Sequence, residues 1–440
     1  MSPTGSTSPS LLPSTASHLS QEGPAWLQRF TAGRSGIERS CFLVAVGMAA
    51  LAFSNAAWQS LHALGWILLI AAAARAGAWP SPPPRRWVTP WAVFAVGSLL
   101  AAGFAPDPGR ALYDTKKLLN LLAVFFFAMV LRTAGDYARA LGAACALMSL
   151  QAVAGLIQYA RVEDHIAFRS QGSLSHHMTF SGLLLISLAF CLPLLTFSLR
   201  RIDLLTWAYC LLALAALLAT LTRSAWIGLA AAAILTLAFK NPRGLWALPV
   251  LLALLFFAVP EFRARTVSIL DTRGDYSNVQ RLSMYPTGLR MVAAHPLLGV
   301  GGRRAVRELY PAFEGTPPTP PPAVPGGPPQ EPYEPPDHLH NNPLQIAAEA
   351  GIPVLLAWLA GLGVFAWEAL RALPRRRDVH DAEERLRRNI LIGALAAVTA
   401  FLTMGMLEYN FGDSEVTVLL FLALSAPLAL RRQPAGARPA

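Results

Sequence analysis

Long apolar runs alternate with short polar connections along most of the 440 residues of this chain. Twelve of the runs approach the roughly 20 residues that cross a bilayer as a helix. They predict transmembrane helices at about 40–57, 61–79, 88–105, 114–132, 137–160, 179–199, 203–221, 224–240, 244–260, 352–371, 389–407 and 415–430. The pattern therefore predicts an all-α polytopic membrane protein with about 12 transmembrane helices.

Composition supports this class and excludes others. The chain is 54% hydrophobic and 14% charged, whereas a soluble domain has about 25% charged residues. This excludes a soluble enzyme, a secreted disulfide scaffold and a disordered protein, and the apolar runs lack the alternation of an outer-membrane barrel. The four cysteines all lie inside apolar runs without metal-ligand spacing, so we interpret them as small hydrophobic residues.

Basic residues orient the predicted helices. Every second connection is basic, which the positive-inside rule assigns to the cytoplasm, so both termini are expected to be cytoplasmic. These connections carry Arg75, Arg85 and Arg86; Arg132 and Arg139; Arg200 and Arg201; Lys240 and Arg243; Arg371, Arg375, Arg376, Arg377, Arg385, Arg387 and Arg388; and Arg431 and Arg432.

The predicted organisation has five parts. A disordered cytoplasmic tail (1–38) precedes helices one to nine (39–260), a large outer loop (261–351), helices ten to twelve (352–432) and a second tail (433–440). The outer loop has helical periodicity on either side of a proline-rich stretch, so we expect a small helical subdomain there.

That stretch contains 11 prolines among residues 316–336. Such a sequence favours an extended polyproline-type segment over helix or strand. A flap over a binding site and a passive linker are both compatible with it.

The outward segments carry more basic residues than the positive-inside rule predicts. The loop contains Arg263, Arg265, Arg273, Arg281, Arg290, Arg303, Arg304 and Arg307, and other outward segments add Arg110, Lys116, Lys117, Arg161, Arg169 and Arg223. Long loops escape the rule, so solvated surface is one interpretation. The other is a site for an anionic ligand, and a lipid-linked diphosphate is the obvious ligand of that charge at a membrane.

Arg223 is harder to explain as solvated surface, because it lies between two apolar runs with almost no loop. It either reaches the membrane interface, pairs with an acid such as Glu408, or binds the anionic ligand.

Two histidines precede a predicted helix start. Asn342 followed by Pro343 is typical of an N-cap and a first helical residue. His338 and His340 would then lie beside a helix N-terminus, whose dipole disfavours the charged imidazolium and leaves a neutral imidazole able to accept a proton. A zinc site that includes Asp337, which lacks an evident third ligand at usual spacing, and purely structural contacts are the alternatives.

A second outer segment holds further candidates. His176 and His177 follow Arg169 closely. We expect them to line the same site, although the sequence signal for them is weaker than that for His338 and His340.

Four segments together resemble the O-antigen ligase and polymerase superfamily of bacterial envelope glycosyltransferases. They are Phe-Arg-Ser-Gln-Gly at 168–172 with His177; Leu-Thr-Arg-Ser-Ala-Trp-Ile-Gly at 221–228; 281–301, which ends His-Pro-Leu-Leu-Gly-Val-Gly; and His340-Asn341 with Leu344 and Gly351. The resemblance covers roughly residues 165–410.

The resemblance implies a GT-C-like membrane glycosyltransferase that moves a glycan from undecaprenyl diphosphate outside the inner membrane. A ligase would pass the glycan to lipid A–core, a polymerase to another lipid-linked repeat, and a related branch to protein hydroxyls. His338 or His340 would orient or deprotonate the acceptor hydroxyl, while Arg223 and Arg281 stabilise the diphosphate.

The same resemblance and the outward position imply a set of substrate-binding candidates: Arg169, Arg265, His176, His177, Lys116, Lys117 and Asn341. No DxD metal-binding motif occurs in the outer loops, so we expect a metal-free mechanism without a cofactor. We favour the ligase over the polymerase because there is one large outer loop. A transporter or flippase of an anionic lipid is the alternative from another class, although its charges should lie at mid-span and inverted repeats are not evident.

Overall fold

The computed structural model describes residues 34, 36–77, 82–163, 168–195, 200–268, 276–315 and 334–431. Residues 1–33 of the predicted N-terminal tail, residues 316–333 of the predicted flap, and the C-terminal tail from 432 onward lie outside the described residues.

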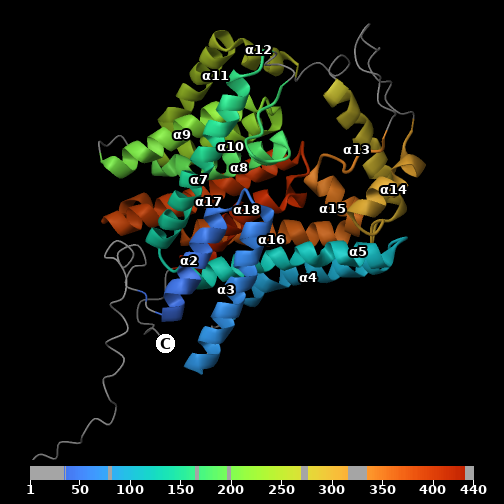
Figure 1. Cartoon of the computed structure of the whole chain (residues 1–440), viewed down its shortest axis with the longest axis horizontal. Helices are drawn as coiled ribbons and strands as arrows, with labels where there is room; N and C mark the ends of the chain where they lie inside the picture. The colour runs from blue at the N-terminus through green and yellow to red at the C-terminus, as the bar shows by residue number, and fades with distance from the viewer. Residues whose placement is uncertain are drawn as a thin grey trace, which may run out of the picture.

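Each of the twelve predicted apolar runs coincides with a helix or with two consecutive helical segments (Figure 1). These are α2 (Gly36–Ala50), α3 (Asn55–Ala76), α4 (Arg85–Gly103), η1 (Thr115–Leu121) with α6 (Leu122–Val130), α7 (Ala134–Ala160), α8 (His177–Cys191) with η2 (Leu192–Leu194), α9 (Arg201–Ala219), α10 (Arg223–Lys240), η3 (Pro242–Trp246) with α11 (Ala247–Ala258), α16 (Ile352–Ala372), α17 (Ala382–Gly405) and α18 (Ser414–Ala429). Short helices α5 (Pro108–Asp114), η4 (Arg376–Asp378) and η5 (Asn410–Gly412) lie between them.

Within the described residues, seven helices are long and apolar enough to cross a membrane: α3, α7, α8 with η2, α9, α10, α16 and α17. The segment from η3 through α11 is followed by α12 (Pro260–Val267) after a bend of 107°, and the pair makes an eighth span if counted as one. The protein is thus an all-α polytopic membrane protein. The count of twelve spans stays a prediction, since α18, for example, is apolar but only 16 residues long.

Helices α8, α17 and α18 form the centre of the bundle: most side chains of α8 and α18 are buried, as are those of α17 from Ile390 onward for the most part. Close approach to α17 depends on glycine. A Cβ added to Gly393 would lie 2.4 Å from the carbonyl oxygen of Phe190 in α8, and one added to Gly228 of α10 would lie 2.8 Å from the carbonyl oxygen of Ala400. Small residues at such contacts maximise van der Waals packing, which drives helix association in lipid.

Four helices occupy the segment for which an outer loop is expected: α12, α13 (Tyr276–Ala294), α14 (Arg303–Phe313) and α15 (Asn342–Ala350). Helices α13, α14 and α15 lie together at one end of the molecule, at the right of Figure 1. They enclose a hydrophobic cluster separate from the main core, built around Met284, Met291, Val306, Tyr310 and Leu339.

A glycine-rich turn between α13 and α14 fixes the C-terminal end of α15. The Val300 amide donates to the carbonyl of Ala348 at 2.8 Å, and the Gly301 amide donates to the carbonyl of Glu349 at 3.0 Å. Gly351 follows α15 with φ of 88°, and a Cβ there would lie 2.2 Å from the carbonyl oxygen of Leu297. Only glycine fits both constraints, so the turn holds α15 against α13 and sets the direction of α16.

We predict that Gly393→Ala lowers the thermal unfolding midpoint of the detergent-purified protein, by an equivalent of about 1–3 kcal/mol, because the added methyl group meets backbone rather than a movable side chain. Gly363→Ala in α16 is the matched control, since nothing lies within 4 Å of its added Cβ. Equal midpoints for the two variants would show that the contact between α8 and α17 tolerates separation.

Candidate active site

The loop before α15 is positioned by two asparagines. The Asn341 side chain caps the helix by accepting from the Leu344 amide at 2.8 Å, and its Nδ2 donates to the carbonyl of Met406 at 2.8 Å. The predicted cap at Asn342 was wrong by one residue, because the buried Asn342 amide instead donates to Asn410 Oδ1 at 2.6 Å. Together the two amides fasten the start of α15 to the connection between α17 and α18.

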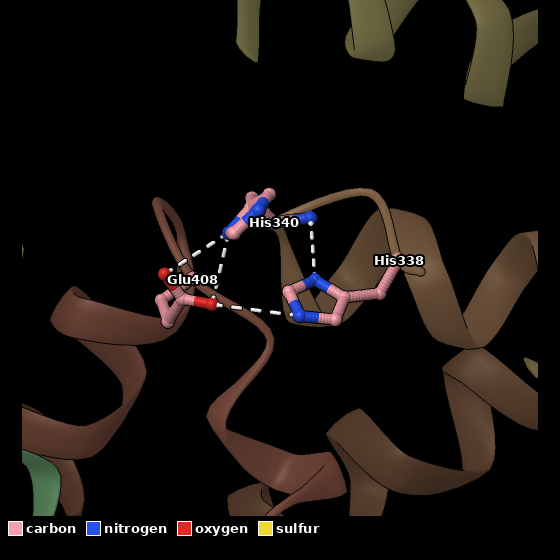
Figure 2. Close-up of side chains that lie close together, drawn as sticks. All are labelled: His338, His340 and Glu408. Atoms are coloured by element: carbon pink, nitrogen blue, oxygen red, sulfur yellow. Dashed lines mark hydrogen bonds and ion pairs between the residues drawn. The ribbon is translucent and has the colours of Figure 1, made fainter. Parts of the chain in front are cut away.

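This attachment brings His338 and His340 to Glu408, which follows α17 (Figure 2). His340 Nδ1 lies 2.9 Å from Glu408 Oε1 and 3.0 Å from Oε2, and His338 Nε2 lies 4.0 Å from Oε1. The backbone amide of His340 donates to His338 Nδ1 at 3.4 Å. His340 has φ of 47°, a left-handed conformation that costs energy in a residue with a Cβ and marks a tightly held position.

These contacts set the chemistry of His340. A carboxylate only accepts hydrogen bonds, so His340 Nδ1 carries a proton and donates a hydrogen bond to Glu408. In the neutral form of the ring with this tautomer, Nε2 is unprotonated and can accept a proton from another group. The same relation of carboxylate to imidazole orients the general base of many hydrolases.

Glu408 is 3% exposed and is stabilised as a carboxylate. Burial by itself raises the pKa of Glu408, but the hydrogen bond from His340 and the electrostatic influence of His340, His338 and Arg281 outweigh burial and lower the pKa to about 2. Arg281 Nη2 lies 3.4 Å from Glu408 Oε2, on the opposite chain segment in α13. Arg281 therefore lies beside the same carboxylate as the histidines and is paired with it; its role in an active site stays a prediction.

Arg169, His176 and His177 lie at the edge of the same site. Arg169 Nη1 is 3.0 Å from His177 Nε2, and the rings of His176 and His177 stack at 4.4 Å. Burial lowers the pKa of His176. The charge of Glu408 opposes this decrease, and His340 and Arg169 add to it. This coupling connects the start of α8 with the His340–Glu408 pair.

Arg223 and Arg265 belong to a neighbouring group. The buried Arg223 donates to the carbonyl and hydroxyl of Ser268, at 3.0 and 2.8 Å, and to Asn278 Oδ1 at 2.9 Å. The Ser268 hydroxyl donates in turn to the carbonyl of Arg265 at 3.0 Å. The partners of Glu408 are Arg281 and the histidines rather than Arg223. Arg223 instead contacts α13 at Asn278, about one helical turn before Arg281.

The two lysines of η1 diverge. Lys117 Nζ donates to the carbonyl of Gly412 at 3.3 Å, close in sequence to Glu408, and its side chain lines a cavity. Lys116 Nζ instead lies 3.7 Å from the centre of the Tyr113 ring.

The sequence reasoning missed the importance of two residues. Glu408 was considered only as a partner for Arg223, although a lone acid directly after an apolar run is itself a signal, since it needs a partner near the bilayer. Arg303 was one of many loop arginines. Its place directly after the glycine-rich turn was the available signal, because such turns fix the direction of the next helix.

Within the described part of the chain, His338, His340 and Glu408 are also the one group of three side chains with a geometry that could hold a metal ion, with ligand atoms within 4.8 Å of one another. Two histidines and a carboxylate are a known zinc set. The third ligand was not evident from sequence because Glu408 lies 68 residues beyond His340. Arg281 beside Glu408 adds positive charge that opposes a cation at this place.

Residues 208–359 match the family model described as O-antigen ligase. The matched segment runs from α9 into α16 and contains Arg223, Arg265, Arg281, His338 and His340. A search of curated proteins found no match. The match supports a ligase- or polymerase-type activity in lipopolysaccharide-related biosynthesis, which involves a lipid-linked glycan and a lipid acceptor in general terms.

We predict that the protein loses stability as the pH falls from about 6.5 to about 4, in part through His338. Burial, together with His340 and Arg303, lowers the pKa of His338 from 6.5 to about 4. Between these values the unfolded chain binds a proton that the folded chain does not, so acid favours unfolding, by about 1–3 kcal/mol for this group.

The measurement is the thermal unfolding midpoint across this pH range for the wild type and for His338→Gln. The variant should have the shallower dependence. Asp413, whose pKa burial raises to about 6, acts in the opposite direction but equally in both proteins. Parallel curves would mean that His338 is accessible to protons in the folded protein.

Proposed function

We propose that this chain, whose residues 208–359 match the O-antigen ligase family model, is an O-antigen ligase. It transfers a glycan from undecaprenyl diphosphate to a hydroxyl of lipid A–core on the periplasmic face of the bacterial inner membrane. Its reaction needs no metal and inverts the anomeric configuration.

The observation that carries this proposal is the pairing of His340 with the buried Glu408, next to Arg281. A glycosyl transfer to a hydroxyl requires a base for the hydroxyl proton and positive charge for the leaving diphosphate. Both requirements are met within one cluster. The matched family supplies the substrate class.

The reaction follows from these positions. His340 Nε2 accepts the proton of the acceptor hydroxyl while the hydroxyl oxygen attacks the anomeric carbon. The new bond between that carbon and the acceptor oxygen forms as the bond from carbon to the diphosphate oxygen breaks, and the electron pair leaves with the diphosphate. Glu408 holds the His340 tautomer and stabilises the imidazolium that forms.

The arginines act on the leaving group. Arg281 and Arg169 flank the histidines from α13 and from the segment before α8, so a diphosphate between them would gain charge-assisted hydrogen bonds as its charge increases. Arg223 and Arg265 position the start of α13 through Ser268 and Asn278.

A polymerase or a protein O-oligosaccharyltransferase would use the same chemistry on another acceptor. A transporter or flippase of an anionic lipid would need cations but no activated imidazole, so the His340–Glu408 pair favours an enzyme. The acceptor is decided by experiment.

We predict that His340→Ala lowers the rate of transfer at least about 100-fold, because the general base is lost. Glu408→Gln should lower it about 10-fold or more, since the amide leaves the tautomer of His340 undetermined. Rates are measured with lipid-linked glycan and lipid A–core in detergent, with the products resolved on a gel.

His380→Ala is the matched control. His380 is exposed and precedes α17, whereas Glu408 follows the other end of that helix. It should leave transfer unchanged. Normal folded yield with normal transfer by His340→Ala would eliminate His340 as the base.

We further predict that wild-type transfer continues in EDTA. Chains that lengthen on the lipid carrier would identify a polymerase, and glycan on a protein would identify the third branch. Loss of transfer in EDTA that zinc restores would assign His338, His340 and Glu408 as metal ligands. If the protein moves lipid across vesicle membranes and transfers glycan to no acceptor, the transporter or flippase function is supported instead.

A further inference from the structure

A cavity of about 320 Å³ is lined by Tyr409, the residue that follows Glu408. The ring of Tyr409 lies 5.6 Å from that of His338 and also lines the cavity. Most of the wall is apolar and comes from α4, η1, α15, α18 and the connection before α18, through Phe94, Leu118, Ile346, Phe421 and Phe411.

One end of this cavity is cationic. Arg303, the first residue of α14, has its guanidinium 6.0 Å from the centre of the Tyr409 ring and, among the described residues, has no hydrogen bond or ion pair. Lys117 uses one of its three donors, on the carbonyl of Gly412. Both groups therefore retain hydrogen bonds to give to an anion.

Two acids also line the cavity, and both are engaged. Glu349 accepts from Gln345 Nε2 at 2.7 Å, and burial raises its pKa, an effect that Gln345, Arg303 and Lys117 oppose. Asp114 lies 3.7 Å from Arg304. Neither acid forms an ion pair with Lys117 or Arg303.

The cationic end opens into a second, wider cavity of about 570 Å³. The two cavities share Asp114 and Arg303, and the charged residues that the second adds are Arg304, Arg307, Glu308 and Asp337. The apolar part of the first cavity, the cations Lys117 and Arg303, and the polar second cavity thus adjoin one another. This sequence of surfaces suits an amphiphile with an anionic headgroup.

A two-substrate transfer needs a second approach to the base. The proposed function places the donor diphosphate at Arg281 and Arg169, and neither of these residues lines the cavity. Lys117 and Arg303 do line it, so a ligand there occupies a place distinct from that of the donor diphosphate.

We propose that this cavity binds the acceptor as a phosphorylated glycolipid, with a phosphate between Lys117 and Arg303. This inference rests on the proposed transferase function. The apolar part of the first cavity takes the end of a hydrocarbon chain, and the sugars occupy the second cavity, with one hydroxyl at His340.

The test compares two acceptors, lipid A–core and lipid A–core stripped of its phosphates. For the wild type, KM should rise about 10-fold or more when the phosphates are removed. Arg303→Gln and Lys117→Gln should raise KM for the phosphorylated acceptor by a similar factor, abolish the preference between the two, and leave KM for the donor unchanged.

Arg110→Gln is the matched control, because Arg110 is an exposed cation of α5 that pairs with Asp107 and does not line the cavity. It should keep the preference for the phosphorylated acceptor. Equal use of both acceptors by the wild type, or a raised KM for the donor in Arg303→Gln, would overturn the assignment while transfer itself stands.

A binding measurement separates this inference from the proposed function. Phosphorylated lipid A–core should raise the thermal unfolding midpoint of the wild type, but not that of Arg303→Gln or Lys117→Gln. If no acceptor receives glycan and this shift persists, the proposed function fails and the lipid site stands. If neither transfer nor the shift occurs, both fail.

Discussion

The buried carboxylate of Glu408 is the interaction on which the candidate site depends. An ionised carboxylate at 3% exposure is costly unless its oxygens are paired. Its partners come from separate segments: His340 from the loop before α15 and Arg281 from α13. Satisfying this one charge therefore holds the outer helices against the membrane bundle, and it does so at the place where the proposed chemistry occurs.

The rest of the scaffold acts on the same short helix. The glycine-rich turn after α13 fixes the C-terminal end of α15 through backbone hydrogen bonds. It packs so closely against Gly351, which follows α15, that no side chain fits there. Asn341 and Asn342 fix its other end on the connection that carries Glu408. Because α15 is held at both ends, the left-handed backbone of His340 is sustained by surrounding structure, and the imidazole keeps one orientation toward the carboxylate.

The sequence was sufficient for the helices and for part of the site. Hydrophobic length located every apolar helix, since burial in lipid imposes the same requirement on each run. Local signals also placed His338 and His340 beside a helix start. Glu408 was beyond such reasoning, because no periodicity connects residues 68 apart. The helix began one residue earlier than predicted, because a tertiary hydrogen bond from Asn342 to Asn410 outweighed its capping preference.

The cations of the site have two effects that reinforce each other. Burial is the main cause that lowers the pKa of His338 and of His176, and Arg303 and Arg169 respectively add to it, so both imidazoles stay neutral. The same guanidinium groups attract phosphate. When an anionic substrate binds, its charge offsets theirs and raises the proton affinity of the nearby imidazoles. Under the proposed function, phosphate binding beside His338 and His176 would therefore favour protonation of these two imidazoles.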